Sequence, residues 1–244
     1  MDRGLYVAMT GAKQIMLAQA VNNGNIANAD TVGFLANGVE FTSEPVYGPG
    51  YPTRVNAVAA NSAVDFGAGV MQDTGRNLDI AVNGSGFIAV QAPDGSEAYT
   101  RAGDLRVTAN GMITTASGLP VLSNSGPVAI PPSTQVTIGS DGTVSVVPLG
   151  LSPSAQSQVD KIKLVDPPTQ DLVKGPDGLL HMKNGGKAKA DLSVTVSSGV
   201  LESSNVNAAQ SLVNMIQLQR LYELQIKSMN SSDQNQQSAE KLMQ

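Results

Sequence analysis

The two ends of the chain carry apolar residues at helical spacing, whereas the part between them does not. Residues 2–28 and 204–243 contain almost no Gly or Pro, and the intervening chain is punctuated by Gly and reads as short strands. A period of 3.6 residues indicates helices, and short alternating runs indicate strands. The pattern predicts an α+β fold in which long N- and C-terminal helices pair as a coiled-coil-like domain and flank a mostly antiparallel, all-β middle domain.

These elements suggest three regions. We expect a terminal helical assembly domain formed by residues 1–34 and 203–244, an extended connector at 35–76 and a β domain at 77–202. The connector is assigned because Pro45, Pro49 and Pro52 fall there among several Gly, with no sustained period of either kind.

The first predicted helix has one apolar face at 100° per residue. It ends in an Asn- and Gly-rich stretch at 22–34, because these residues adopt cap and turn conformations that others resist. The face is formed by Leu5, Ala8, Met9, Ala12, Ile15, Met16 and Ala20.

The second predicted helix has apolar residues on two sides. Asn207, with Gln210 three residues on, resembles a capping box in which Asn takes the Ser/Thr place. Such a helix expects neighbours on more than one side. One expected face holds Leu212, Met215, Ile216, Tyr222 and Ile226, and the other holds Leu218, Leu221 and Met229.

A comparison of ordering entropy with burial free energy indicates that these ends function in an assembly. Ordering about 25 terminal residues costs roughly 25–50 kcal/mol of backbone entropy. Burying seven apolar side chains returns about 10–20 kcal/mol, at ~1.5–3 kcal/mol each. The terminal helices are therefore marginal alone, and we expect other chains to complete their burial.

The middle region is marked by strands and tight turns. Residues 77–82 alternate, the run breaks at Asn83-Gly84-Ser85-Gly86, and a second strand follows at 87–90. Their spacing is typical of an antiparallel β body. Further turns are expected at Asp94-Gly95, Asn110-Gly111, Ser117-Gly118, Asp141-Gly142, Asp177-Gly178 and Gly185-Gly186.

Composition narrows the classes of partner. The net charge is −5 and the isoelectric point is near 4.8, which argues against nucleic acid as a partner. The chain has no Cys, so it has no disulfide and no thiolate site. The N-terminus lacks a basic and then apolar signal pattern, and no run approaches ~20 apolar residues. We expect no cleaved signal peptide and no direct membrane insertion.

No residue pattern predicts a catalytic, cofactor-binding or metal site. His181 is the one His and is expected in a strand or turn. Gly84-Ser85-Gly86 lacks the Gly of a nucleophile elbow, and Gly185-Gly186-Lys187 lacks the leading Gly and the Ser/Thr of a phosphate-binding loop. Scattered carboxylates are interpreted as surface charges: Asp160, Asp166, Asp171 and Asp177. We expect a protein that is not an enzyme.

Two other hypotheses stay open on these residues alone. One is a secreted adhesive or carbohydrate-binding β module with a coiled-coil stalk, although the chain lacks the Trp that a sugar platform favours. The other is a β-rich hydrolase that uses an Asp pair, which predicts a cleft with a carboxylate of raised pKa.

Three ordered motifs resemble the flagellar axial family, the rod and hook proteins of the bacterial flagellum. The first is Asn25-Ile26-Ala27-Asn28 followed by Thr31-Val32-Gly33-Phe34. The second is Leu78 to Phe87 with Tyr99-Thr100-Arg101-Ala102-Gly103. The third is Leu201 to Asn207, leading to Arg220-Leu221-Tyr222-Glu223. Gly24 and Leu35 depart from the family pattern, which usually has Asn and a basic residue there. Within the family, the start of the chain and its length most resemble the proximal rod protein, with the distal rod protein as the alternative.

The resemblance implies a structural subunit of the basal-body rod, the hollow periplasmic drive shaft that transmits motor torque and encloses the export channel. Its partners would be copies of itself, other proximal and distal rod proteins and, during secretion, the flagellar type III export apparatus. No cofactor is implied. The assembly interface would comprise Leu5, Met9, Ala12, Met16, Asn25, Asn28, Gly33, Phe34, Leu201, Asn205, Leu212, Met215, Ile216, Tyr222 and Ile226.

Overall fold

The protein, a computed structural model, is described at residues 4–45, 47, 55–150 and 156–242. The chain divides into two compact units. We call the first the helical unit, from residues before 30, Ala36–Asp65 and residues from Val206 onward. The second, the β unit, comprises Asp30–Leu35 and Phe66–Asn205. The helical predictions for residues 2, 3 and 243 lie outside the described residues.

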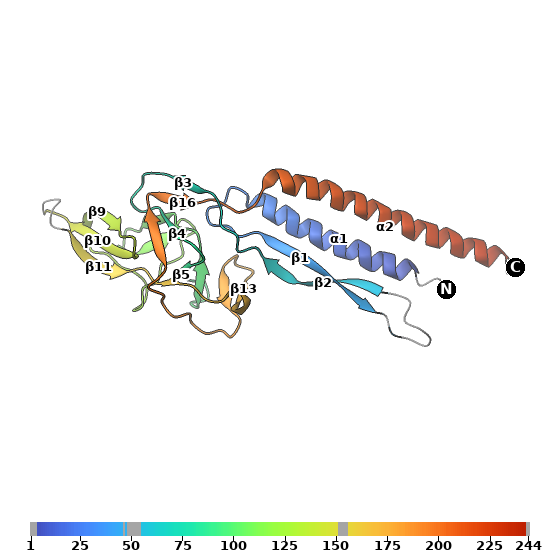
Figure 1. Ribbon diagram of the computed structural model, residues 1–244, viewed down its shortest axis with the longest axis horizontal. Coiled ribbons are helices and arrows are strands. Elements are labelled where there is room, and N and C mark those ends of the chain that lie inside the picture. Colours follow the sequence, from blue (N-terminus) through green and yellow to red (C-terminus); the bar gives the residue numbers. More distant parts are fainter. Residues whose placement is uncertain (1–3, 46, 48–54, 151–155, 243–244) are drawn as a thin grey trace. The chain divides into compact units, whose positions relative to one another are not determined.

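Two antiparallel helices and a hairpin form the helical unit (Figure 1). Helix α1 spans Gly4–Ala27 and helix α2 spans Ala208–Leu242, which confirms the two predicted terminal helices. Strands β1 (Asn37–Pro45) and β2 (Val55–Val64) pair antiparallel and contact α1. In Figure 1, α1 lies between α2 and the hairpin, and the C-terminal part of α2 runs on past the start of α1.

Small side chains let α1 lie close to its neighbours. Its buried residues are Ala8, Ala12, Ala18 and Asn22. A Cβ atom added at Gly11 would lie 3.2 Å from the side chain of Gln225 in α2. The Asn22 side-chain amide donates to the carbonyl of Ser211, also in α2, at 2.8 Å. The helices are therefore joined by the close approach of the Gln225 side chain to the α1 backbone and by a buried hydrogen bond. No large apolar residue is fully buried among those described in the two helices.

Asn207 caps α2 as predicted. Its side-chain oxygen accepts the N–H of Gln210 at 3.0 Å, which satisfies one of the donors that a helix N-terminus leaves unpaired. The Gln210 side chain donates to Asn214 instead of returning to the cap. Only half of the expected capping box therefore forms.

The segment expected to be a connector contains the β1–β2 hairpin. Its register runs from Asn37 opposite Val64 to Pro45 opposite Val55, with one bulge after Val39. The strands escape a pattern search because polarity does not follow burial in β2. Val55 is exposed there, whereas the next residue, Asn56, is half-buried.

The β unit is built from short antiparallel strands, as predicted. A five-stranded sheet has the order β12-β5-β6-β14-β13, a three-stranded sheet has the order β11-β10-β9, and β15-β4, β16-β3 and β7-β8 form pairs. One 3-10 turn, η1 (Thr169–Asp171), precedes β13. The strands are β3 (Met71–Asp73), β4 (Ile80–Asn83), β5 (Phe87–Gln91), β6 (Glu97–Thr100), β7 (Leu105–Val107), β8 (Ile113–Thr115), β9 (Ser133–Ile138), β10 (Thr143–Pro148), β11 (Ser157–Lys161), β12 (Leu164–Val165), β13 (Leu172–Lys174), β14 (Leu180–Met182), β15 (Thr195–Ser198) and β16 (Val200–Glu202).

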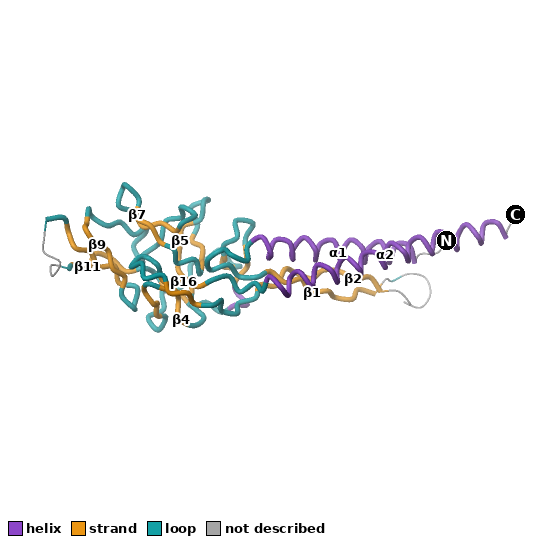
Figure 2. Tube along the Cα trace, turned by 90° about the horizontal axis from the view of Figure 1, so that it is seen from above, coloured by secondary structure: helices purple, strands orange, loops and turns teal. Residues whose placement is uncertain are grey.

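The core of the β unit is aliphatic, in line with a chain that has no Trp. Its fully buried members come from all of the larger sheets, and Figure 2 shows how much loop connects these short strands. They include Ile80, Val82, Ile88, Val90, Leu105, Ile113, Val121, Val128, Val144 and Val146.

The predicted turns are confirmed by backbone conformation. The Gly at each of the six further turn sites has positive φ, between 66° at Gly185 and 86° at Gly118. Gly84 also has positive φ, at 86°, in the turn between β4 and β5. These two strands belong to different sheets, so this turn passes the chain from one sheet to another.

Candidate assembly surface

Large apolar side chains are exposed along both helices. On α1, Met9 is 51% exposed and Met16 is 57% exposed, and on α2 the values are 51% for Leu212 and 54% for Ile216. Isolated exposed apolar residues are ordinary, but rows along a helix mark interaction sites. Leaving out Leu242 at the end of α2, we call these exposed residues the outer rows: Tyr6, Met9, Met16 and Leu17 on α1, and Leu212, Val213, Ile216, Leu221 and Leu224 on α2.

The two predicted faces of α2 are divided differently in the structure. Met215 and Tyr222 are half-buried, together with Leu218 and Met229 from the other predicted face. Successive members of this set are three, four and seven residues apart, which fits the seven-residue repeat of a coiled-coil seam. Leu212 and Ile216 lie outside that seam because they are displaced from it by a quarter to a third of a turn.

The remaining predicted helix residues are less accessible. Ala12 is buried in α1, and Leu5 and Ile226 are half-buried. In the outer rows, the predicted set is therefore represented by Met9, Met16, Leu212 and Ile216. The sequence pattern missed Tyr6, Leu17, Val213 and Leu224, although their apolar type and i, i+3 or i+4 spacing were visible signals.

Asn25 and Asn28 have bonds within their own chain. Asn25 forms two hydrogen bonds with the backbone of Asn37: its amide donates to the carbonyl at 2.7 Å, and its oxygen accepts the N–H at 2.9 Å. The side chain thus imitates a neighbouring strand and joins the end of α1 to the start of β1. Asn28 donates to the carbonyl of Gly24 at 2.8 Å.

Segments from all three motifs meet in the β unit. The Gly33 N–H donates to the carbonyl of Glu202 at 2.8 Å, and the Asn205 N–H donates to the carbonyl of Phe34 at 3.2 Å. Gly33 has φ +65°, and a Cβ atom there would lie 2.3 Å from the backbone of Arg101 and Ala102. We call residues 33–35, 67–70, 101–102 and 202–205 the crossing cluster.

The 67–70 segment joins the same cluster. The Ser203 N–H donates to the carbonyl of Val70 at 2.9 Å, and the Asn205 side-chain amide donates to the carbonyl of Gly67 at 3.0 Å. A Cβ atom at Gly69 would lie 1.9 Å from the Ser203 carbonyl oxygen. Only Gly allows this approach. Leu201, the motif residue next to the cluster, is half-buried in β16.

A buried ion pair lies at the centre of the cluster. Arg101 Nη1 is 3.0 Å from Glu202 Oε1, and the two side chains are 2% and 1% exposed. The same oxygen accepts the N–H of Gly69 at 2.8 Å, and Arg101 Nη2 donates to the carbonyl of Gly84 at 2.9 Å. The guanidinium also lies 5.2 Å from the centre of the Phe87 ring. Arg101 belongs to the second sequence motif and Glu202 to the third. Their pairing could not be deduced from the sequence because they are 101 residues apart.

Lys174 holds the other side of Phe34. Its ammonium nitrogen is 3.9 Å from the centre of the Phe34 ring and donates to the carbonyl of Leu35 at 2.6 Å. Burial lowers the pKa of Lys174 to about 8, because desolvation disfavours the charged amine. The motif residue Phe34 therefore contacts its own β unit, and nothing in the sequence around Lys174 predicted this.

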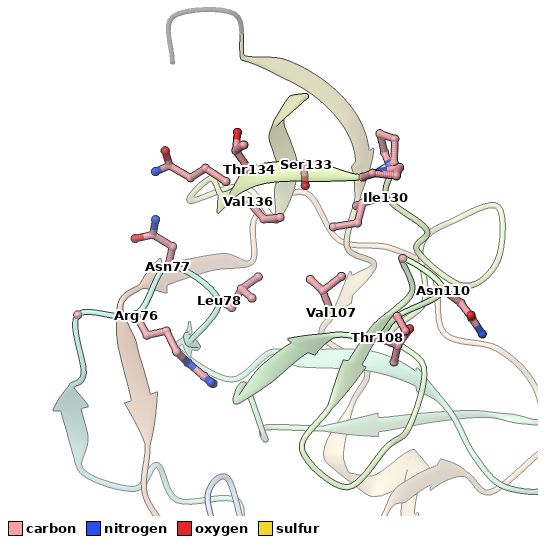
Figure 3. Close-up of a pocket in the computed structure, with 16 residues that line it drawn as sticks. Arg76, Asn77, Leu78, Val107, Thr108, Asn110, Ile130, Ser133, Thr134 and Val136 are labelled. Atoms are coloured by element: carbon pink, nitrogen blue, oxygen red, sulfur yellow. The ribbon is translucent and has the colours of Figure 1, made fainter. Parts of the chain in front are cut away.

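The β unit also contains a hollow of about 740 Å³. Figure 3 shows it between the loop that carries Asn77, the end of β7 and strand β9, with Leu78, Val107 and Val136 toward its interior. Its described lining holds no Asp, Glu or His, and Arg76 is paired with Asp79. His181 lies in strand β14 and contacts Asp177 at 3.0 Å.

The described residues show neither a metal site nor a membrane-spanning helix. They hold no group of three or more His, Cys, Asp or Glu side chains placed to bind a metal ion. No helix in that part of the chain combines the length and the apolar character needed to span a membrane.

The chain matches two family descriptions. Residues 81–146 match the flagellar hook protein FlgE/F/G D1 domain, and residues 197–242 match the flagellar basal body rod FlgEFG protein C-terminal region. The first match lies within the β unit, and the second includes all of segment 202–205 of the crossing cluster and all of α2.

Full-length relatives carry the same description. The chain is 38% identical to the flagellar basal-body rod protein FlgF of Escherichia coli (strain K12), over 100% of this chain and 99% of that one. Identity is 36% to FlgF of Salmonella typhimurium, with the same coverage. It is 33% to the rod protein FlgG of Buchnera aphidicola subsp. Schizaphis graminum, over 94% of this chain and 95% of that one. These relatives do not favour an adhesive module or a hydrolase. The chain belongs to the flagellar basal-body rod proteins of the FlgF type, a family of structural subunits of the rod.

Proposed function

We propose that this chain polymerises through α1 and α2 with copies of itself and with other rod proteins to form the proximal part of the hollow drive shaft. The observation that carries this proposal is the pair of outer rows on the two helices. The predicted interface residues Asn25, Asn28, Gly33 and Asn205 form hydrogen bonds within their own chain, so they would shape the subunit and not contact a neighbour directly.

The energetics favour several neighbours over one. Each exposed side chain of the outer rows already has about half of its surface covered within the chain. Full burial would therefore contribute about 1 kcal/mol per side chain, half of the usual ~1.5–3 kcal/mol. Association costs about 4–15 kcal/mol. Because the rows lie on both helices, each subunit would need contacts on more than one side. This favours a lattice in which each copy contacts several others.

Coiled-coil packing is the geometry we infer for the contacts. The half-buried seam of α2 has steps of three, four and seven residues. Seams with this seven-residue repeat pack at a crossing angle of ~20°. The outer rows would extend the same packing to neighbouring subunits. Torque would then be transmitted mechanically by interlocked side chains, and this role would need no chemical reaction. Family membership further supports a periplasmic rod location and export by the flagellar type III apparatus.

A double substitution on the outer row of α2 tests the proposal. Leu212→Gln with Ile216→Gln removes two exposed apolar side chains while keeping good helix formers. We expect the free chain to keep its circular dichroism and melting temperature, and we expect loss of swimming in a bacterium that lacks its own copy of the corresponding rod gene.

A matched control separates assembly from general surface effects. Leu192 is 82% exposed in the β unit, so Leu192→Gln makes the same change outside the outer rows. Swimming should be retained by this control. Normal swimming by the Leu212→Gln, Ile216→Gln variant would show that the outer row of α2 is not an assembly contact.

A further inference from the structure

Every covalent connection between the two units begins or ends near the crossing cluster. The chain passes between the units after residues 29, 35, 65 and 205. Residues 33–35, 67–70 and 202–205 are therefore the ends of the β unit from which the chain continues into the helical unit. Any force carried along the backbone between the units must pass through these segments.

The ion pair at the centre of this cluster contributes little net stability, because burying its two charges has a large free-energy cost. Moving two charges out of water carries a desolvation cost that their attraction repays only when all remaining polar atoms are bonded. Here Arg101 Nε and Glu202 Oε2 are buried and have no hydrogen-bond partner among the described residues. Packed apolar residues of similar volume often stabilise such sites as well or better.

The pair has directional bonds that an apolar pair would lack. Glu202 Oε1 accepts from Arg101 and from the N–H of Gly69, while the second Arg101 nitrogen holds the carbonyl of Gly84. Glu202 is also the residue of β16 that pairs with Met71 of β3. A slip of β16 by one residue would turn its side chain to the opposite face and break these bonds. The carboxylate thus distinguishes one register from its neighbours.

We propose that Arg101 and Glu202 are positioning residues that fix the register of the three connecting segments, and hence the points where the helical segments leave the β unit. Their contribution is to specificity and not to stability. A buried polar group that selects one register at a cost in stability is known from coiled coils. The role in assembly rests on the proposed function, but the positioning itself is tested on the free full-length chain.

The test compares local with global protection from amide hydrogen exchange. In Arg101→Met with Glu202→Leu, we expect a melting temperature equal to or above that of the wild type. The N–H groups of Gly33 and Asn205 bond to backbone carbonyls that the substitutions leave in place, and their exchange should accelerate at least tenfold relative to that of Val90 in the core. This ratio of exchange rates reports register because a general loss of stability would accelerate all three amides together.

Two single variants keep the proposal testable if the double variant does not fold. Glu202→Gln retains an acceptor of the same shape, so the ratio of cluster to core protection should stay within threefold of the wild type even if the melting temperature falls. Arg101→Lys retains the charge but cannot form both of the arginine's bonds, so the ratio should fall. The proposal would be overturned if the ratio of cluster to core protection were unchanged in Arg101→Lys. It would also be overturned if the double variant had a lower melting temperature and an unchanged ratio. Loss of swimming without a change in the ratio would count against it in the same way.

Discussion

At the scale of one residue, Gly33 is a motif residue that allows two backbone segments of the β unit to lie in close contact. It combines positive φ with a backbone contact that leaves no room for a Cβ atom. Gly33→Ala should therefore lower the free energy of unfolding by about 2–4 kcal/mol, from the left-handed conformation and from overpacking. Chemical denaturation followed by tyrosine fluorescence would measure this.

Gly118 is the matched control for that prediction. It has φ +86°, but a Cβ atom there would meet nothing within 4 Å. Gly118→Ala should cost only about 1–2 kcal/mol, from the backbone conformation alone. Equal losses of unfolding free energy in the two variants would mean that the close backbone contact at Gly33 does not contribute to the cost of the substitution.

Lys174 predicts a dependence of stability on pH. Its pKa in the folded chain is about 8, below the ~10.4 expected in the unfolded chain. Between these values the unfolded chain holds a proton that the folded chain has released, so the free energy of unfolding rises with pH. Below pH 8 both states are protonated, so Lys174 adds no further change of the unfolding free energy with pH.

The measurement is the difference in unfolding free energy between the wild type and Lys174→Met, taken from pH 7 to pH 10.5. We expect the wild type to gain relative to the variant above pH 8. All other titrating groups are shared by the two chains and cancel. A difference that stays constant over this range would show that burial does not lower the pKa.

At the scale of elements, α2 depends on its N-cap. The Asn207 side chain accepts the N–H of Gln210, and removing it leaves that donor unpaired. Asn207→Ala should reduce helix stability by about 0.5–2 kcal/mol, whereas Asn207→Ser should restore most of it. Thermal melts followed at the helical circular dichroism band would compare the three chains. If Ala and Ser behave alike, the cap bond is not significant in solution.

At the scale of the whole molecule, the two units should differ in stability. The buried residues of α1 are Ala and Asn, and the one buried residue described in α2 is Ser211. The β unit instead buries Ile, Leu, Val, Phe and Tyr, which contribute far more per residue. In the free chain, amides of residues 5–20 should exchange much faster than those of β5 and β10. Strong protection at residues 5–20 would contradict this.

Local patterns in the sequence predicted much of this fold because they depend on neighbouring residues. Gly at Asp-Gly and Asn-Gly sites sets positive φ without help from the rest of the chain, and the helical period marks α1 and α2. The β1–β2 hairpin was hidden because Val55 faces solvent while Asn56 is half-buried. Its strands are held by pairing and by contact with α1, neither of which leaves a period.

The sequence by itself determined two terminal helices, a β body of short antiparallel strands, the turn positions and, through its motifs, the family. Tertiary structure alone decided which apolar residues of α2 face inward, as Met215 and Leu218 do, and which stay exposed, as Leu212 does. It also decided that Arg101 and Glu202 meet. The physical reason is that helices and turns follow from bonds between residues a few positions apart. Pairing over 101 residues depends on how the whole backbone closes.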